Sequence, residues 1–250
     1  MFGSSSPLPP GTSLAPGPVA PAYMLLPPDT GPSAVVCASP HSGRIYPGDL
    51  LDALGIDLLH LRQVEDFAID RLFSFVPRYH APLIRALYAR TYVDLNRAID
   101  EIDPTMFTGG TPGPARPSVR VDAGLGCMPR LASGGAAIYA RKLTRAEGQA
   151  RLQQVYAPYH KALSSHLKQA RDLHGRAVLI DAHSMPSQIG GRAIRHDIVL
   201  GDRFGTSCDK ALIDSVEARL RAEGLSVARN APYAGGYSTQ TYGRPGRGSH

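Results

Sequence analysis

The sequence has no tryptophan, only three cysteines, and only four lysines among its 27 basic residues. Cys37, Cys127 and Cys208 are odd in number and far apart, which argues against a disulfide framework and a C-x-x-C zinc knuckle. We therefore expect a reducing, cytoplasmic location. No apolar run approaches the ~18 residues of a membrane span, and the first residues lack a secretion signal, so we predict no membrane partner.

The formal net charge of +6 is spread along the chain, with no block of consecutive like charges. A nucleic-acid binder more often gathers basic residues on one face or alternates them with exposed aromatic residues. We therefore predict no nucleic-acid partner. The same charge suits a small anionic substrate.

Two regions differ in composition. Residues 1–32 are rich in proline, glycine and serine, which cannot bury enough apolar surface to offset the entropy of ordering them, and this predicts a flexible arm. Residues 33–250 are long enough to bury a sizeable core and are predicted to form one domain.

The patterns after the arm predict an α/β domain. Near-continuous apolar strands interleaved with helices are typical of a mainly parallel or mixed sheet covered on both faces. A capping box at Thr144 and Glu147 predicts a long helix ending at Gly175, with a kink at Pro158. The other expected helices are 61–74, 82–89 and 209–223, and the expected strands include 34–39, 90–95, 176–184 and 225–229.

Two of these strands end in a histidine. His41 follows the apolar run 34–39, and His183 follows "VLIDA". In a parallel sheet both would lie at the same carboxyl edge, where Glu65 or Asp66 could complete a His, carboxylate, His site for zinc with an open water position. The alternative is that these histidines simply bond to the backbone.

Two arginines bracket the segment "RTYVDLNR". Arg90 and Arg97, the latter beside Asn96, offer forked donors that match a carboxylate. The alternative is a structural ion pair with Asp94 or Asp100.

Several short motifs occur in one order along the chain: "PHSG", "ED", "DLNR", "DAHS", "LGDRFGTSCD" and "GGYSTQTYGRPGRGSH". From about Ala34 to the last residue they resemble the N-formylglutamate amidohydrolase family. Through "DLNR" and the two histidines the chain is also distantly similar to aspartoacylases and zinc carboxypeptidases.

The resemblance implies a fold and an activity. The fold is the phosphorylase/hydrolase-like α/β fold, a mixed, mainly parallel sheet between helices. The activity is metal-dependent hydrolysis of N-formyl-L-glutamate, or a similar N-acyl amino acid, to glutamate and formate, as in histidine degradation. The implied cofactor is a divalent metal, with zinc expected.

The resemblance also implies roles for individual residues. His41, Asp66 and His183 match the metal ligands, with Asp66 a better match than Glu65. Arg90 matches an arginine near the developing oxyanion, and Asn96 with Arg97 matches the fork for the substrate carboxylate. The expected pocket wall contains Arg203, Tyr237 and Thr239.

Family members continue into a further strand that carries a glutamate resembling the general base. The resemblance therefore implies that the fold lacks its C-terminal strand after His250, and that hydrolysis is slow without it. Two other functions remain open. One is a cysteine-dependent amidase that uses Cys208 near a helix start, and the other is a non-catalytic carboxylate-binding module.

Overall fold

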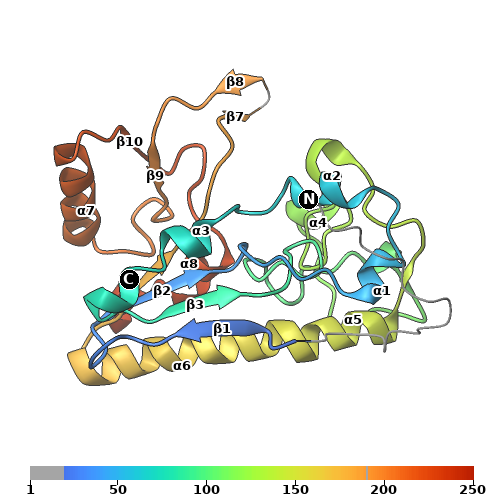
Figure 1. Ribbon diagram of the computed structural model, residues 1–250, viewed down its shortest axis with the longest axis horizontal. Coiled ribbons are helices and arrows are strands. Elements are labelled where there is room, and N and C mark those ends of the chain that lie inside the picture. Colours follow the sequence, from blue (N-terminus) through green and yellow to red (C-terminus); the bar gives the residue numbers. More distant parts are fainter. Residues whose placement is uncertain (1–19, 190) are drawn as a thin grey trace, which may run out of the picture.

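The computed structural model describes residues 20–189 and 191–250 (Figure 1). Its helices are α1 Gly48–Leu51, α2 Leu58–Arg62, α3 Ile69–Leu72, α4 Val119–Asp122, α5 Arg145–Arg151, α6 Ala157–His174, α7 Lys210–Ala222 and α8 Tyr237–Tyr242. Its strands are β1 Tyr23–Leu26, β2 Val35–Ser39, β3 Leu83–Ala86, β4 Phe107–Thr108, β5 Leu143–Thr144, β6 Val178–Asp181, β7 Gln188–Ile189, β8 Arg192–Ala193, β9 Ile198–Leu200 and β10 Val227–Arg229.

A four-stranded sheet with the order β1-β3-β2-β6 forms the centre of the molecule (Figure 1). β2 runs parallel to both β3 and β6, whereas β1 is antiparallel to β3. The prediction of a mixed, mainly parallel sheet with helices is therefore confirmed. In register, Ala38 of β2 lies opposite Asp181 of β6. The loops after these two strands consequently start at the same edge of the sheet.

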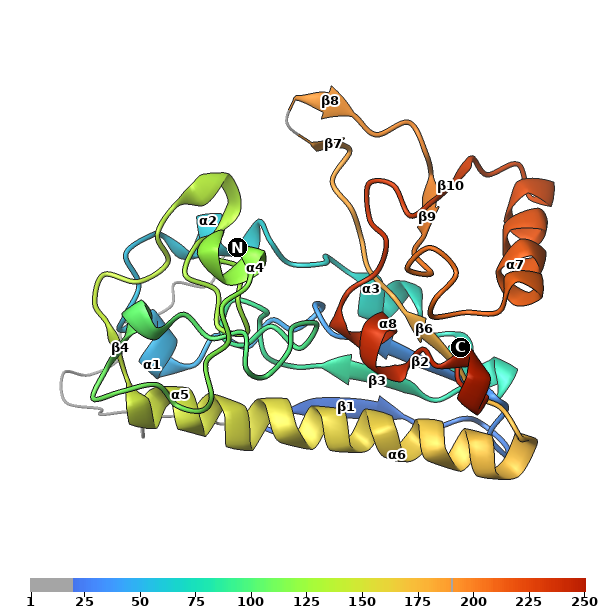
Figure 2. The ribbon, with the colours of Figure 1, turned by 180° about the vertical axis from the view of Figure 1, so that it is seen from behind.

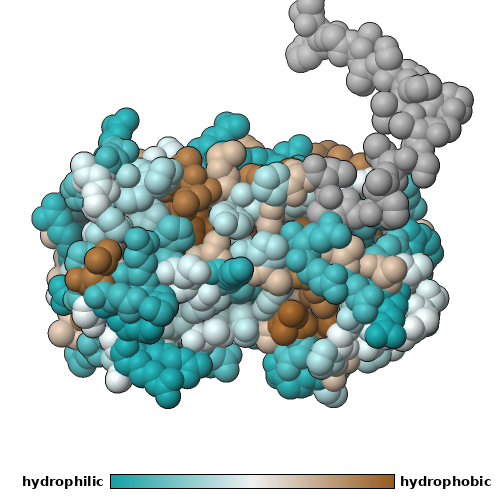
Figure 3. Space-filling view, turned by 90° about the horizontal axis from the view of Figure 1, so that it is seen from below, coloured by the Kyte–Doolittle hydropathy of each residue, from teal (hydrophilic) through white to brown (hydrophobic). Residues whose placement is uncertain are grey.

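A long helical rod covers one face of this sheet (Figure 2). The capping box at Thr144 and Glu147 is present at its start, and Gly175 ends it in the left-handed conformation, as predicted. Just before Pro158, residues Leu152–Tyr156 form a π-helical turn in which the Ala157 amide donates to the Leu152 carbonyl, while the kink at Pro158 stays a prediction. The wider turn lies directly before the proline, which cannot donate a backbone hydrogen bond. The surface viewed from the side of α6 is mainly hydrophilic (Figure 3).

Three predicted elements were wrong. Residues 82–89 contain strand β3 rather than a helix, because a short apolar run buried on both sides has no periodicity that separates the two. Residues 90–95 form tight turns rather than a strand. The predicted helix 61–74 is interrupted: α2 and α3 are separated by a loop in which Ala68 takes a left-handed conformation.

The flexible arm predicted over residues 1–32 extends too far toward the carboxyl end, because part of it belongs to the central sheet. Residues 1–19 lie outside the described residues. Residues 23–26, "YMLL", form the edge strand β1, because their apolar side chains can pack beside β3.

A second unit lies beside the sheet, on the side away from α6 (Figure 1). Parallel strands β9 and β10 are connected by α7. We call these elements, residues 198–229, the outer lobe. The loops that connect them to the rest of the chain lead back to the edge of the sheet where β2 and β6 end.

The last residues of the chain lie along β6. The Leu179 amide donates to the His250 carbonyl (2.7 Å), and the His250 amide donates to the Ala177 carbonyl (2.9 Å). The prediction of a further strand after His250 stays a prediction. Among the described residues, no helix combines the length and the apolar character needed to cross a bilayer.

Candidate metal centre

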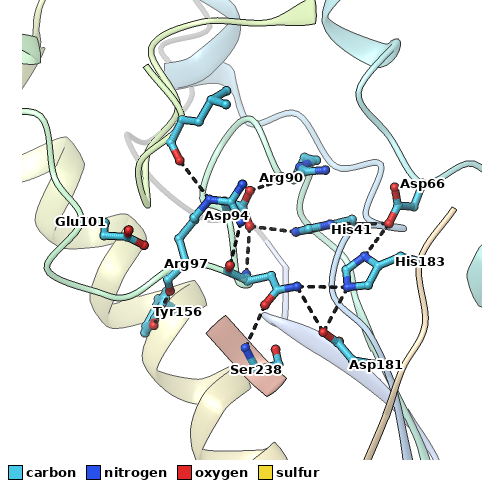
Figure 4. Close-up of polar contacts among 12 residues, drawn as sticks. His41, Asp66, Arg90, Asp94, Arg97, Glu101, Tyr156, Asp181, His183 and Ser238 are labelled. Atoms are coloured by element: carbon cyan, nitrogen blue, oxygen red, sulfur yellow. Dashed lines mark hydrogen bonds and ion pairs between the residues drawn. The ribbon is translucent and has the colours of Figure 1, made fainter. Parts of the chain in front are cut away.

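His41, Asp66 and His183 come together at the carboxyl edge of the central sheet (Figure 4). Asp66 Oδ2 lies 2.8 Å from His183 Nδ1 and 3.5 Å from His41 Nδ1. His41 and Asp66 are buried, whereas the His183 side chain is 30% exposed. The cluster is thus open to solvent on the His183 side.

The fold explains why these three residues meet. His41 and His183 follow the in-register parallel strands β2 and β6. Asp66 lies in the loop between α2 and α3, and its amide donates to the His41 carbonyl (3.1 Å). Glu65 points elsewhere, because it accepts hydrogen bonds from Tyr46 and Arg62. Of the two neighbouring carboxylates, Asp66 is therefore the one at the cluster.

Each of the two histidines also contacts a carboxylate of its own through its Nε2 atom. His41 Nε2 lies 2.8 Å from Asp94 Oδ1, and His183 Nε2 lies 3.0 Å from Asp181 Oδ2. If each Nε2 carries the proton, each Nδ1 keeps a lone pair directed at the cluster. His41 Nδ1 is indeed buried and, among the described residues, has no hydrogen-bond partner.

These contacts shift the ionisation of the cluster. Burial raises the pKa of Asp66, but the hydrogen bond from His183 and the proximity of the His41 ring outweigh it, so the net pKa lies below the ordinary value. Burial alone would lower the pKa of His183, yet Asp181 and Asp66 raise it to about 10. Without a metal, the cluster therefore holds an imidazolium between two carboxylates.

The donor set fits a divalent metal ion. Two imidazole nitrogens and a carboxylate oxygen are ligands typical of catalytic zinc. Ligand atoms about 2.0–2.1 Å from a tetrahedral zinc lie roughly 3.3 Å apart. The two distances from Asp66 Oδ2 to the histidine nitrogens, 2.8 and 3.5 Å, bracket that separation.

Arg90 lies beside the cluster. Its Nη2 donates to Asp94 Oδ2 (2.7 Å), and its side chain is 23% exposed. Burial opposes ionisation of Asp94, but Arg90 and His41 outweigh it and hold the pKa of Asp94 well below its usual value. The structural pair with Asp94 is therefore present. Within the described chain, the other guanidinium nitrogens of Arg90 have no hydrogen-bond partner.

Asn96 and Arg97 follow Asp94. Asn96 Oδ1 accepts from the Ser238 amide (2.8 Å), while its Nδ2 lies 3.1 Å from Asp181 Oδ2. Arg97 donates to two backbone carbonyls, those of Leu125 (3.0 Å) and Asn96 (2.9 Å). Among the described residues its Nη2 makes no hydrogen bond, so its N–H groups can donate to a ligand.

A known protein-family model matches most of this chain. Residues 33–250 match the family model described as N-formylglutamate amidohydrolase. The chain belongs to the N-formylglutamate amidohydrolase family. The match covers the region that the sequence predicts to be one domain.

Individual members of the N-formylglutamate amidohydrolase family are similar along most of their length. The N-formylglutamate deformylase of Pseudomonas aeruginosa is 31% identical over 86% of this chain and 77% of its own, and that of Pseudomonas putida is 29% identical with the same coverage. The crystal structure of N-formylglutamate amidohydrolase from Ralstonia eutropha superposes with a TM-score of 0.85 at 38% identity. That match covers 93% of this chain and 84% of the other.

The three residues expected in the pocket wall come from two other parts of the chain, the loop after β9 and helix α8. Arg203 has φ +53° in the loop after β9, and its amide donates to the Ala234 carbonyl (2.8 Å). Tyr237 and Thr239 belong to α8, where the Thr239 hydroxyl donates to the Gly236 carbonyl (3.1 Å). Among the described residues, none of these three side chains bonds to a metal-ligand candidate, and their placement in the pocket stays a prediction.

Sequence reasoning missed the part that Asp94 plays at the cluster. It treated Asp94 only as a possible ion-pair partner of an arginine, whereas Asp94 also holds His41 in position. The only local signal is its place two residues before Asn96 in "DLNR". Ser238, which binds the Asn96 side chain, gave no such signal.

Cys208 lies just before α7. Burial raises the pKa of its thiol, and Asp202 and Asp209 act in the same direction. A nucleophilic thiolate needs the opposite shift. The raised pKa of Cys208 therefore does not favour the cysteine-dependent mechanism.

Proposed function

We propose that this chain is a metal-dependent hydrolase that cleaves N-formyl-L-glutamate, or a similar N-acyl amino acid, to glutamate and formate. The observation that carries the proposal is the buried Nδ1 of His41. Asp94 binds the other nitrogen of this ring, and Nδ1 has no partner among the described residues although it faces Asp66 and His183. The names of the related enzymes support the substrate.

His41, Asp66 and His183 would hold the ion, with zinc as the expected metal. When bound, a divalent metal supplies a water whose pKa is lowered toward ~7 and polarises the scissile carbonyl. Asp94 and Asp181 orient the two imidazole rings, which is the usual work of carboxylates that bind metal-ligating histidines.

Arg90 would stabilise the oxyanion that forms from the formyl oxygen. Its ion pair with the buried Asp94 fixes the guanidinium, and its other N–H groups have no hydrogen-bond partner among the described residues. One well-aimed donor of this kind typically contributes ~3 kcal/mol to stabilising the transition state.

Arg97 would bind a carboxylate of the substrate through the Nη2 atom. Its two bonds to backbone carbonyls hold the guanidinium in one orientation. That Asn96 also binds the substrate carboxylate stays a prediction, because in the structure its side chain contacts Ser238 and Asp181.

Each carboxylate at or beside the cluster already accepts a hydrogen bond from a neighbouring side chain. Asp66 and Asp94 accept from histidines, and Asp181 accepts from both His183 and Asn96. Glu65 is turned toward Tyr46 and Arg62. None of these carboxylates is free to act as the base in this arrangement.

The test combines elemental analysis with formate release from a panel of N-acyl amino acids. We expect N-formylglutamate to be the best substrate, a chelator to abolish turnover, and added metal to restore it. Inhibition by iodoacetamide with no effect of chelators would instead favour Cys208. Ligand binding without any turnover, even with added metal, would identify a non-catalytic carboxylate-binding module.

A further inference from the structure

His160 lies in a cluster of four tyrosines on the sheet side of α6. Its Nδ1 is 2.8 Å from the hydroxyl of Tyr242. Ring centroids lie 4.3 Å away for Tyr156, 5.4 Å for Tyr159, 5.6 Å for Tyr237 and 6.1 Å for Tyr242. The imidazole thereby connects α6 to both ends of α8.

The start of α8 is bound to Asn96. The Ser238 amide donates to Asn96 Oδ1 (2.8 Å), and the Tyr237 amide donates to the Asn96 carbonyl (3.4 Å). A Cβ added to Gly236 would lie 2.5 Å from both polar atoms of the Asn96 side chain. No side chain fits between this helix and Asn96, so a shift of α8 toward Asn96 would displace the amide.

The contact with Ser238 also decides which way the amide points. Because Oδ1 accepts from a backbone N–H, the NH₂ group must face the other direction. There it lies 3.1 Å from Asp181 Oδ2 and 3.0 Å from His183 Nε2. Asp181 can then accept from both Asn96 and the His183 ring, which leaves His183 Nδ1 directed at the metal cluster.

The π-helical turn before α6 directly supports the next residue, Arg97. The Tyr156 hydroxyl donates to the Arg97 carbonyl (2.8 Å). Burial lowers the pKa of His160 to about 4, so the ring is neutral near pH 7 and acts as a hydrogen-bonding group rather than a charge.

We infer that His160 is a positioning residue for the reaction: through Tyr242 and α8 it fixes the Asn96 amide, and through that amide the Asp181–His183 pair. The inference rests on the proposed function for its kinetic consequence. Its structural part, that His160 holds α8 on Asn96, can be measured without any substrate.

The kinetic experiment uses His160→Phe, Tyr242→Phe and the double variant. Both single changes keep an aromatic ring and remove the His160–Tyr242 hydrogen bond, so we expect kcat to fall about tenfold in each. KM should stay within about twofold, because the Arg97 side chain is untouched. The double variant should be no slower than the slower single variant, because both changes break the same contact.

Two further variants separate positioning from packing. His160→Asn restores a polar atom near the position of Nδ1, and it should recover most of kcat. His166→Phe changes another histidine of α6, one whose side chain makes no hydrogen bond with the described residues, and it should behave like the parent. Effects of the two single changes that multiply, or a kcat that follows the melting temperature alone, would overturn the inference.

Hydrogen exchange of the Ser238 amide in metal-free protein provides the readout without substrate. We expect faster exchange in His160→Phe and Tyr242→Phe, and unchanged exchange in His166→Phe. Equal protection in all variants would overturn the inference. If the parent protein does not hydrolyse N-formylglutamate but Ser238 is deprotected as expected, the proposed function fails and the structural part of the inference stands.

Discussion

Helices α6 and α7 are both amphipathic by sequence, yet they are buried to different depths. α6 buries Tyr159, Leu163, Leu167 and Ala170 against the central sheet. In α7, by contrast, none of the residues is buried. An apolar stripe therefore predicts that a helix forms, whereas the depth of its burial depends on the partner that the fold provides.

The central sheet and the outer lobe differ in burial in the same way as these two helices, and both lie near the candidate site. The metal-ligand candidates His41 and His183 follow strands of the central sheet, whereas Arg203 lies in a loop of the outer lobe. The tightly packed region thus holds the groups whose geometry must be precise. The less buried region holds Arg203, whose place in the pocket wall stays a prediction.

The largest expected effect is loss of the metal from the central region. His41→Ala or His183→Ala removes one of three ligands, so we expect the folded protein to lose its one equivalent of zinc. Elemental analysis after dialysis measures this, and His174→Ala, an exposed histidine at the end of α6, is the control. Full occupancy in both ligand variants would rule out the site.

A core substitution in α6 should come next. Leu163 is 0% exposed, so Leu163→Ala leaves a cavity and should reduce the free energy of unfolding by about 2–5 kcal/mol. Urea denaturation of the metal-free protein measures this. A loss below about 1 kcal/mol would mean that the central region is packed less tightly than the structure indicates.

Arg97→Lys tests the carboxylate site at the sheet edge. The substitution keeps the charge and loses the two donors fixed by Leu125 and Asn96, so binding of glutamate should weaken about tenfold. Calorimetric titration gives the affinity. An unchanged affinity would remove Arg97 from the substrate site.

The smallest effect is expected in the outer lobe. Val216 in α7 is 39% exposed, and Val216→Ala should change the free energy of unfolding by no more than about 0.5 kcal/mol. The same urea experiment measures it beside Leu163→Ala. A loss comparable to that of Leu163→Ala would contradict the contrast between the two helices.

Much of the candidate site could be predicted because its residues follow recognisable strands. The apolar runs before His41 and His183 indicate buried strands, and two parallel neighbours end at one edge. The capping box likewise predicts the start of α5, because it depends on residues only three positions apart.

Other features depend on contacts distant in sequence. β3 is a strand because it lies between β1 and β2 in the sheet. The sequence of residues 82–89 contains no pattern that indicates this pairing. The contact between Ser238 and Asn96 joins residues that are 142 positions apart in the sequence. Local periodicity carries no information about such pairs, so the helix predicted over 82–89 was wrong and the role of α8 was not foreseen.

The in-register pairing of β2 with β6 also constrains the order of events during biosynthesis. His41 leaves the ribosome early, but its partner strand follows roughly 140 residues later, and closing so long a loop is slow. The nascent chain therefore carries one imidazole of the cluster without the other until most of the domain has been made. If the chain binds a metal as proposed, capture through both histidines becomes possible only after β6 has joined the sheet.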